Sequence, residues 1–144
     1  MKTIFILDND SAQQKLMNHH LTAMGFEVRS VMSAAEFESL SDKPFMIILD
    51  EKMENKDKSS MQFLKKVHRK MSRVPVVYMV NRPERKIISD AKKNGAYEVI
   101  EKNSAAFVNL RTTLDKLMNE PVKSGWLARI FAKKQSQNLP ALSI

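Results

Sequence analysis

Short apolar runs alternate with longer segments of mixed polarity along the first 120 residues of the chain. Five of these runs, each four to six residues long, are rich in branched side chains, which is typical of strands buried in a parallel sheet. The predicted strands are Thr3–Leu7, Glu27–Val31, Phe45–Leu49, Pro75–Val80 and Tyr97–Ile100.

The segments between the predicted strands place apolar residues three or four positions apart, which is the spacing of an amphipathic helix. Five helices are predicted: one capped by Asp10 and ending at Gly25, one opening with the capping-box pair Ser33 and Glu36, and three over about 60–71, about 83–94 and from Ser104 to before Pro121. Five strands alternating with five helices predict a doubly wound α/β domain with right-handed crossovers.

Polar side chains follow the predicted strands at the edge where doubly wound sheets bind their ligands. Carboxylates from two strands and a lysine from a third are therefore expected to converge there. The residues at these strand ends are Asp8, Asn9 and Asp10 (first strand), Asp50 and Glu51 (third), Val80 and Asn81 (fourth), and Glu101 and Lys102 (fifth).

This combination of side chains favours phosphoryl chemistry. Clustered carboxylates repel one another unless a cation neutralises them, and one or two Asp side chains suit Mg²⁺, which also binds phosphate oxygens. A nearby lysine supplies a point charge for a phosphoryl group. The parts together suggest phosphoryl transfer to an aspartate. The alternative is that these are solvated loop residues, which is common at strand ends.

The motifs ILDND, FMIILD, PVVYMV and GAYEVIEKN occur in this order and at a spacing that resembles the bacterial response-regulator receiver domain. The resemblance covers about residues 1–120. It implies a flavodoxin-like sheet of order 2-1-3-4-5 with five flanking helices. It also implies that Asp50 accepts a phosphoryl group from a histidine kinase or phosphotransfer protein, and that Lys102 contacts the phosphate. Mg²⁺ would be held by Asp8, Asn9, Asp50 and the main-chain carbonyl of Lys52.

Several positions depart from the pattern of that family, and three of them concern the metal site and the switch. Asn9 replaces the usual second acid, which should weaken Mg²⁺ binding. Val80 replaces the Thr or Ser whose hydroxyl responds to phosphorylation, and Val99 replaces the aromatic residue that follows this movement. Without the hydroxyl, the usual switch lacks its hydrogen bond. We therefore also consider that Lys52 or Arg82 neutralises the carboxylates in place of Mg²⁺, the alternative being that both point into water.

The net charge of the chain is +8, from 24 Lys and Arg against 16 Asp and Glu, and half of it lies in residues 121–144, which contain no acid. The remainder is mildly basic, so nucleic acid is not an obvious partner. There is no cysteine, no signal-peptide pattern and no apolar run long enough to span a bilayer, which together favour a cytoplasmic protein.

A basic amphipathic tail, residues 121–144, is expected to follow the receiver-like domain of residues 1–120. Its short predicted helix carries an apolar face, which suggests packing against its own domain, a second copy or a partner protein. The alternative is peripheral contact with an acidic membrane surface. The residues of this face are Trp126, Leu127, Ile130 and Phe131.

The sequence thus predicts a stand-alone, atypical receiver in a two-component phosphorelay, cytoplasmic and not an enzyme. It would accept a phosphoryl group on Asp50 and signal to a downstream protein by contact, because two dozen further residues are too few for a DNA-binding domain. The alternative is a pseudo-receiver that acts as a scaffold or adaptor without phosphorylation.

Overall fold

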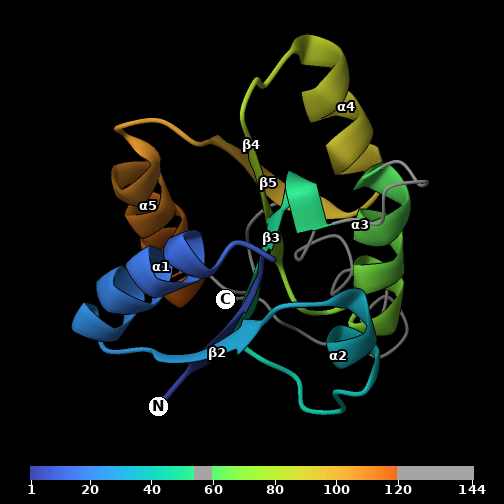
Figure 1. Cartoon of the computed structure of the whole chain (residues 1–144). Coiled ribbons are helices and arrows are strands. Elements are labelled where there is room, and N and C mark those ends of the chain that lie inside the picture. Colours follow the sequence, from blue (N-terminus) through green and yellow to red (C-terminus); the bar gives the residue numbers. More distant parts are fainter. Residues whose placement is uncertain (54–59, 120–144) are drawn as a thin grey trace, which may run out of the picture.

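A computed structural model describes residues 1–53 and 60–119 of the chain. Its centre is a five-stranded parallel sheet in the order β2-β1-β3-β4-β5, which confirms the predicted doubly wound, flavodoxin-like architecture (Figure 1). The strands are β1 (Thr3–Leu7), β2 (Glu27–Val31), β3 (Met46–Asp50), β4 (Val76–Val80) and β5 (Ala96–Glu101).

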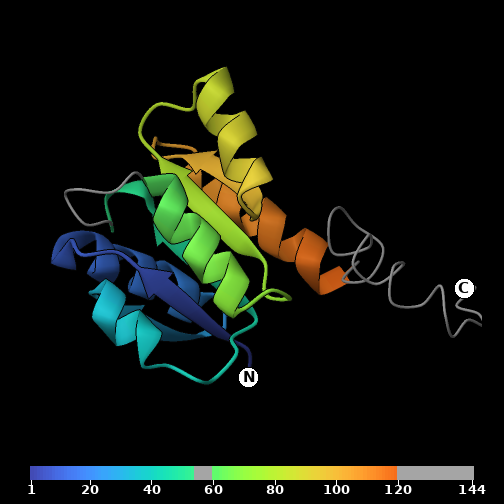
Figure 2. The same ribbon diagram turned by 90° about the vertical axis from the view of Figure 1, so that its right-hand side faces the viewer.

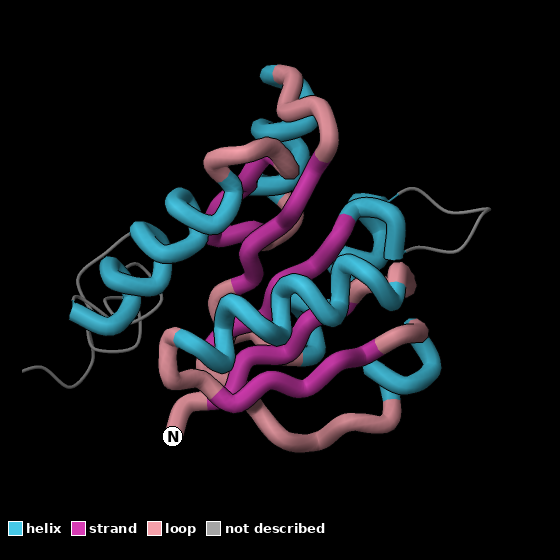
Figure 3. Tube along the Cα trace, turned by 60° about the vertical axis from the view of Figure 1, so that its left-hand side comes forward, coloured by secondary structure: helices cyan, strands magenta, loops and turns pink. Residues whose placement is uncertain are grey.

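Five α-helices cover the two faces of the sheet. Helices α1 and α5 lie on one face and α2, α3 and α4 on the other, so that two hydrophobic clusters form, one on each side (Figure 1 and Figure 2). Figure 3 shows the fold from the side on which α1 and α5 lie. The helices are α1 (Ser11–Ala23), α2 (Ala34–Glu38), α3 (Ser60–Lys70), α4 (Arg85–Lys93) and α5 (Ala106–Asn119), and a 3₁₀ turn, η1 (Glu51–Met53), follows β3.

Local polar groups fix the helix ends at the positions that the sequence predicts. The Asp10 carboxylate accepts hydrogen bonds from the main-chain N–H groups of Ala12 and Gln13 and so caps α1. Ser33 caps α2 by accepting from the N–H of Glu36. Gly25 ends the turn after α1 with a φ of 95°, a left-handed conformation that favours glycine.

The middle strand ends one residue later than predicted, and the difference concerns the candidate site. Asp50 is paired with Met79 in the ladder between β3 and β4, so its main chain belongs to the sheet. All five residues of β3 are buried. The carboxylate of Asp50 is therefore presented by a rigid strand end and not by a loop.

The tail predictions at Trp126, Leu127, Ile130 and Phe131 lie outside the described residues, as does the boundary at residue 120. Within residues 1–53 and 60–119, no helix has the length and apolar character that a bilayer span requires.

Candidate phosphoacceptor site

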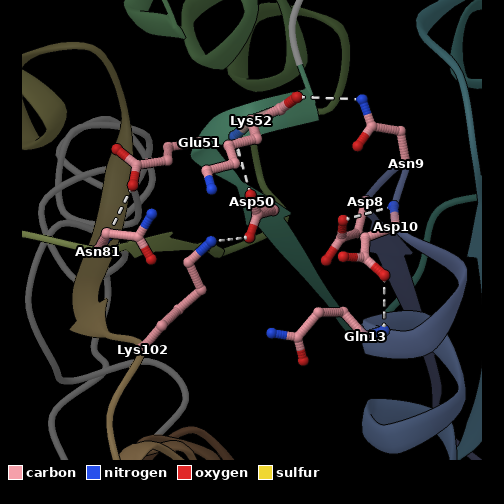
Figure 4. A network of polar contacts seen from close by, with 9 residues as sticks. All are labelled: Asp8, Asn9, Asp10, Gln13, Asp50, Glu51, Lys52, Asn81 and Lys102. Carbon is pink, nitrogen blue, oxygen red and sulfur yellow. Dashed lines mark hydrogen bonds and ion pairs between the residues drawn. The ribbon is translucent and has the colours of Figure 1, made fainter.

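Asp50 and Lys102 form a short, shielded ion pair at the carboxyl edge of the sheet (Figure 4). Lys102 follows β5, and its Nζ lies 2.6 Å from Oδ2 of Asp50 at the end of β3. The Lys102 side chain is 14% exposed and that of Asp50 is 6% exposed. The other carboxylate oxygen, Oδ1, accepts the main-chain N–H of Lys52 at 2.8 Å. Both oxygens of Asp50 thus have a donor, yet each keeps a second lone-pair position for another bond.

Asp8 places a second carboxylate beside this pair. It follows β1, is 6% exposed, and accepts the main-chain N–H of Asp10 through Oδ1 at 2.9 Å. Burial raises the pKa of Asp8, and the negative charge of Asp50 raises it further, while the Asp10 N–H and Lys102 act in the opposite direction. Two carboxylates and one lysine thus share the site, which leaves a surplus of negative charge.

Asn9 connects the loop after β1 to the turn after β3. Its side-chain Nδ2 donates a hydrogen bond to the main-chain oxygen of Lys52 at 3.1 Å (Figure 4). The family resemblance assigns this same oxygen to the metal. The amide of Asn9, in place of the usual acid, therefore has two effects. It removes a negative charge, and it donates a hydrogen bond to the main-chain oxygen of Lys52, which competes with a metal ion for that oxygen.

The main chain of β4 helps to position Lys102. The N–H of Lys102 donates to the carbonyl oxygen of Val80 at 2.8 Å, which anchors the start of the loop after β5. The Val80 side chain is fully buried, and the partly buried Val99 packs against the same cluster as Val80. The two positions where the sequence departs from the family pattern are therefore apolar packing positions.

Gln14 is a buried polar residue of the site region that the sequence pattern did not single out. Its Nε2 lies 2.8, 2.9 and 3.2 Å from the main-chain oxygens of Ile6, Asp8 and Val31, so it links α1 to the ends of β1 and β2. The signal was present in the sequence, because Gln14 lies three positions before Met17 on the inward stripe of α1.

Glu51 makes a further link that sequence reasoning missed. Its Oε2 accepts the main-chain N–H of Asn81 at 2.6 Å, which ties the turn after β3 to the loop after β4. The acid after Asp50 is thus engaged with the main chain of the neighbouring loop rather than with a ligand.

A cavity of about 170 Å³ lies beside the carboxylates, between α1, α5 and the edge of the sheet. Asp8, Asp50 and Lys102 form part of its wall, with apolar side chains of α1 and α5 on the other side. Asp50 therefore borders an enclosed space at this edge of the sheet.

The hypothesis that Lys52 or Arg82 neutralises the carboxylates is wrong for the described part of the structure. Both side chains are exposed, and neither forms an ion pair with Asp8 or Asp50. Lys102 supplies the cation instead, because the loop after β5 reaches across β4 to the end of β3.

The donor set of the site meets the needs of Mg²⁺. This ion commonly uses one or two carboxylates and completes its shell with water and phosphate oxygens, and Asp8 and Asp50 supply those carboxylates. No group of three or more metal-ligating His, Asp or Glu side chains exists in residues 1–53 and 60–119. The residues therefore fit a Mg²⁺ ion that depends on water and phosphate for most of its ligands.

The fold and this site together define a doubly wound α/β domain whose functional edge presents two aspartates and a lysine from the ends of three strands. Residues 4–115 match the family model of the response regulator receiver domain. The match covers well over half of the chain, so the chain belongs to the response-regulator receiver family. No curated protein matches it in sequence.

Solved structures with the same fold share about a fifth of their residues with this chain. A receiver domain protein (CheY-like) from Methanospirillum hungatei JF-1 has a TM-score of 0.73 at 20% identity, covering 86% of this chain and 99% of that one. TrrA of Thermotoga maritima, solved in complex with Mg(2+)-BeF, has a TM-score of 0.67 at 21% identity, covering 81% and 99%.

A response regulator from Burkholderia pseudomallei, solved with a phosphorylated aspartic acid, a calcium ion and citrate, has a TM-score of 0.68 at 16% identity. The alignment covers 99% of this chain and 78% of that chain. At these identities the likeness establishes the fold.

Proposed function

We propose that this receiver accepts a phosphoryl group on Asp50 from a histidine kinase or a phosphotransfer protein. The observation that carries the proposal is the placement of Lys102 Nζ at 2.6 Å from Asp50 Oδ2, beside Asp8 and on the wall of a cavity. A buried nucleophile next to a fixed ammonium group is the arrangement that transfer of a phosphoryl group needs, because catalysis of this step is mostly positioning and charge neutralisation.

In the proposed step, an oxygen of Asp50 forms a bond to phosphorus while the bond from phosphorus to the donor nitrogen or oxygen breaks. The leaving group takes the electron pair of that bond. Lys102 then moves its hydrogen bond from the carboxylate to an oxygen of the arriving phosphoryl group, which needs only a small rotation of its flexible stem. The main-chain N–H of Lys52 holds the second carboxylate oxygen throughout.

Asp8 and Asp50 are the residues that would hold Mg²⁺, which would neutralise the charge that gathers on the transferred group. The hydrogen bond from Asn9 to the main-chain oxygen of Lys52 competes for one further ligand. We infer that this receiver binds Mg²⁺ weakly in the absence of a phosphoryl group.

Output would use protein contact, and the signal would not pass through a hydroxyl at position 80, because Val80 is a fully buried apolar residue.

One observation favours the second candidate function, a pseudo-receiver that acts as an adaptor. Lys102 already pairs with Asp50, and Asn9 with the main-chain oxygen of Lys52, so both of these groups have a partner without phosphate or metal.

The test is intact-mass analysis of the protein after incubation with acetyl phosphate, with and without Mg²⁺. We expect an adduct of one phosphoryl group that requires Mg²⁺ and is lost in Asp50→Asn. Asp10→Asn is the matched control, because it removes the same charge two residues from Asp8 while asparagine still caps α1. A lack of adduct in the wild type at every Mg²⁺ concentration would reject the proposal in favour of the adaptor.

A further inference from the structure

The positive charge of the described residues is concentrated on one part of the fold. Residues 60–95, a quarter of the chain, contain ten Lys and Arg against two acidic residues, so their own net charge equals the +8 of the whole chain. This segment contains α3, β4 and α4, and the two helices lie side by side on one face of the sheet (Figure 1 and Figure 2). All ten basic residues are exposed. The mild average charge of the domain therefore conceals a strongly basic surface.

One basic stripe of α3 is committed to the neighbouring helix α2. Lys66 forms an ion pair with Glu38 at 3.3 Å. Lys70 donates hydrogen bonds to the main-chain oxygens of Phe37 and Glu38, and its ammonium lies 5.0 Å from the centroid of the Phe37 ring. Lys70 thus contributes to packing within the domain, whereas Lys66 makes only an exposed ion pair.

The other basic residues of α3 lie next to the side of the helix that contacts the turn after α4. His68 lies against the turn after α4, where a Cβ added to Gly95 would overlap the Cγ of the His68 ring. Lys65 lies three positions before His68 and four positions before Arg69, so its side chain is a neighbour of each of them on the surface of the helix. Neither Lys65 nor Arg69 forms an ion pair or a side-chain hydrogen bond within the described residues.

Helix α4 carries cations at both ends: Lys92 and Lys93 stand in its last turn, where the helix dipole favours positive charge, but its first turn is basic as well. Arg85 and Lys86 stand in its first turn, where the helix dipole disfavours positive charge. Lys86 and Lys92 reach only exposed ion pairs, with Asp90 at 3.6 Å and with Glu98 at 3.5 Å, and such pairs contribute little to stability. The stability of the fold therefore does not account for the positive charge in the first turn of this helix.

Six exposed cations of this surface have neither an ion pair nor a side-chain hydrogen bond in the described part of the chain, and we call them the α3–α4 basic face. They are Lys65, Arg69, Arg73, Arg82, Arg85 and Lys93.

The apolar content of the surface decides which kind of anionic partner it fits. The large exposed apolar side chains of the described residues belong to other parts of the fold: Met1, Leu16, Met32, Val108 and Met118. The two aromatic residues between positions 60 and 95, Phe63 and Tyr78, are buried. Within residues 60–95, the face therefore lacks an apolar anchor for a membrane, an aromatic anchor for a protein interface and a stacking platform for unpaired bases.

The phosphate backbone of a nucleic acid needs none of these features, since Lys and Arg alone can bind it through charge. We propose that the α3–α4 basic face binds the phosphate backbone of duplex nucleic acid without reading the base sequence. The proposal does not rest on the phosphoryl chemistry at Asp50, because the ion-pair partner of that carboxylate is Lys102, which is not one of the six cations. It requires no separate DNA-binding domain.

The test measures binding of the full chain to a fluorescently labelled duplex DNA of about 20 base pairs by anisotropy, between about 50 and about 200 mM salt. Six cations that each neutralise one phosphate predict a slope of log affinity against log salt of about −5. The variant Lys65→Glu with Arg69→Glu should lower the affinity more than about tenfold at the lowest salt and flatten the slope by about 2.

The matched control is Lys15→Glu with Arg111→Glu, which makes the same change of net charge with exposed residues of α1 and α5 on the opposite face of the sheet. It should lose less than about threefold in affinity. Thermal unfolding checks that both variants fold, and Lys65→Gln with Arg69→Gln replaces the first variant if it does not.

Equal losses in the two variants would overturn the proposal, because net charge or another segment would then carry the binding. An absence of salt-dependent binding to the duplex would also overturn it. The proposal would also be overturned if the protein bound vesicles of phosphatidylglycerol but not the duplex, and if these variants weakened its binding to the vesicles.

Discussion

Lys102 Nζ lies 2.6 Å from Asp50 Oδ2, and both side chains are largely withdrawn from water. The loop after β5 reaches past β4 to make this contact with the end of β3. The ion pair thus joins two strands that are not neighbours in the sheet. Lys102 also offsets the mutual repulsion of Asp8 and Asp50, which the topology of the sheet places side by side.

Replacing Lys102 with Met should therefore destabilise the domain. The variant keeps the apolar stem but leaves two carboxylates in a buried site without a cation, and removing one partner of such a pair costs about 3 kcal/mol. Urea unfolding at pH 7 measures the loss. Lys116→Met, at an exposed position of α5, should change the free energy of unfolding by less than about 0.5 kcal/mol.

A double-mutant cycle separates the ion pair from simple packing. Asp50→Asn in the Lys102→Met background should recover most of the lost stability, because it removes the stranded charge. If the double variant is no more stable than Lys102→Met alone, the ion pair does not hold the site together.

The convergence of Asp8, Asp50 and Lys102 could be predicted because it depends on topology alone. Parallel strands end at one edge of a sheet, and each of these residues ends or follows a strand, so no side-chain detail is needed. The helix caps at Asp10 and Ser33 were predictable for a similar reason, since capping depends on residues only two or three positions apart.

Contacts that depend on side-chain rotamers and on the approach of separate loops could not be predicted from the sequence. Asn9 could have turned either its oxygen or its nitrogen toward the site, and only the packed loops determine that its amide donates to Lys52. The same holds for the link from Glu51 to Asn81. The wrong choice of Lys52 or Arg82 as the neutralising cation has the same origin, because a position at the edge of the sheet does not determine which cation reaches Asp50.

Asn9→Asp should strengthen Mg²⁺ binding. The substitution supplies a third negative oxygen ligand and removes the donor that occupies the main-chain oxygen of Lys52, so we expect the dissociation constant to fall roughly tenfold. Isothermal titration calorimetry at neutral pH measures it.

The control for Asn9→Asp is Asn18→Asp, which adds the same charge on α1 at a residue whose side chain bonds Thr22. Its Mg²⁺ affinity should match the wild type. Equal affinities for wild type and Asn9→Asp would show that Asn9 does not limit the metal site.

Asp8→Asn should stabilise the metal-free domain at neutral pH. Burial raises the pKa of Asp8 above 3.8, so the folded protein holds the proton more tightly than the unfolded chain does. The contribution of Asp8 to stability is therefore full below pH 3.8 and is lost as the pH rises through its folded pKa. Asparagine avoids this loss and can still accept the Asp10 N–H.

We expect Asp8→Asn to raise the Tm at pH 7 in EDTA by about 3–5 °C, which is roughly 1 kcal/mol for a domain of this size. The gain should shrink as the pH is lowered toward 3.8. Asp10→Asn removes the same charge at an exposed position and should change the Tm by less than about 1 °C relative to the wild type. A gain in Asp8→Asn that is constant with pH would mean that the buried charge is not its cause.

Gly95→Ala should be far more damaging than Gly25→Ala, although both glycines have a left-handed φ. At Gly25, with φ of 95°, an added Cβ would meet nothing within 4 Å, so only backbone strain of about 1–2 kcal/mol is expected. At Gly95, with φ of 110°, the Cβ would overlap Cγ of His68 and lie 2.6 Å from its Cβ. The Cβ of His68 is fixed to the main chain of α3 and cannot rotate away, so a total cost of about 3–4 kcal/mol is expected.

Urea unfolding of the two variants measures the difference, which isolates the contact between α3 and the turn after α4. His68→Ala in the Gly95→Ala background should restore only part of the stability, because it removes the ring but keeps the Cβ of position 68 at 2.6 Å. His68→Gly in the same background removes both the ring and the Cβ, so it should restore more of the stability. The gain is reduced by about 1 kcal/mol, because glycine has a low helix propensity and position 68 lies in α3. Equal losses in Gly95→Ala and Gly25→Ala would mean that α3 can move away from the turn. The two helices that carry the basic face would then be less firmly fixed to each other than this contact implies.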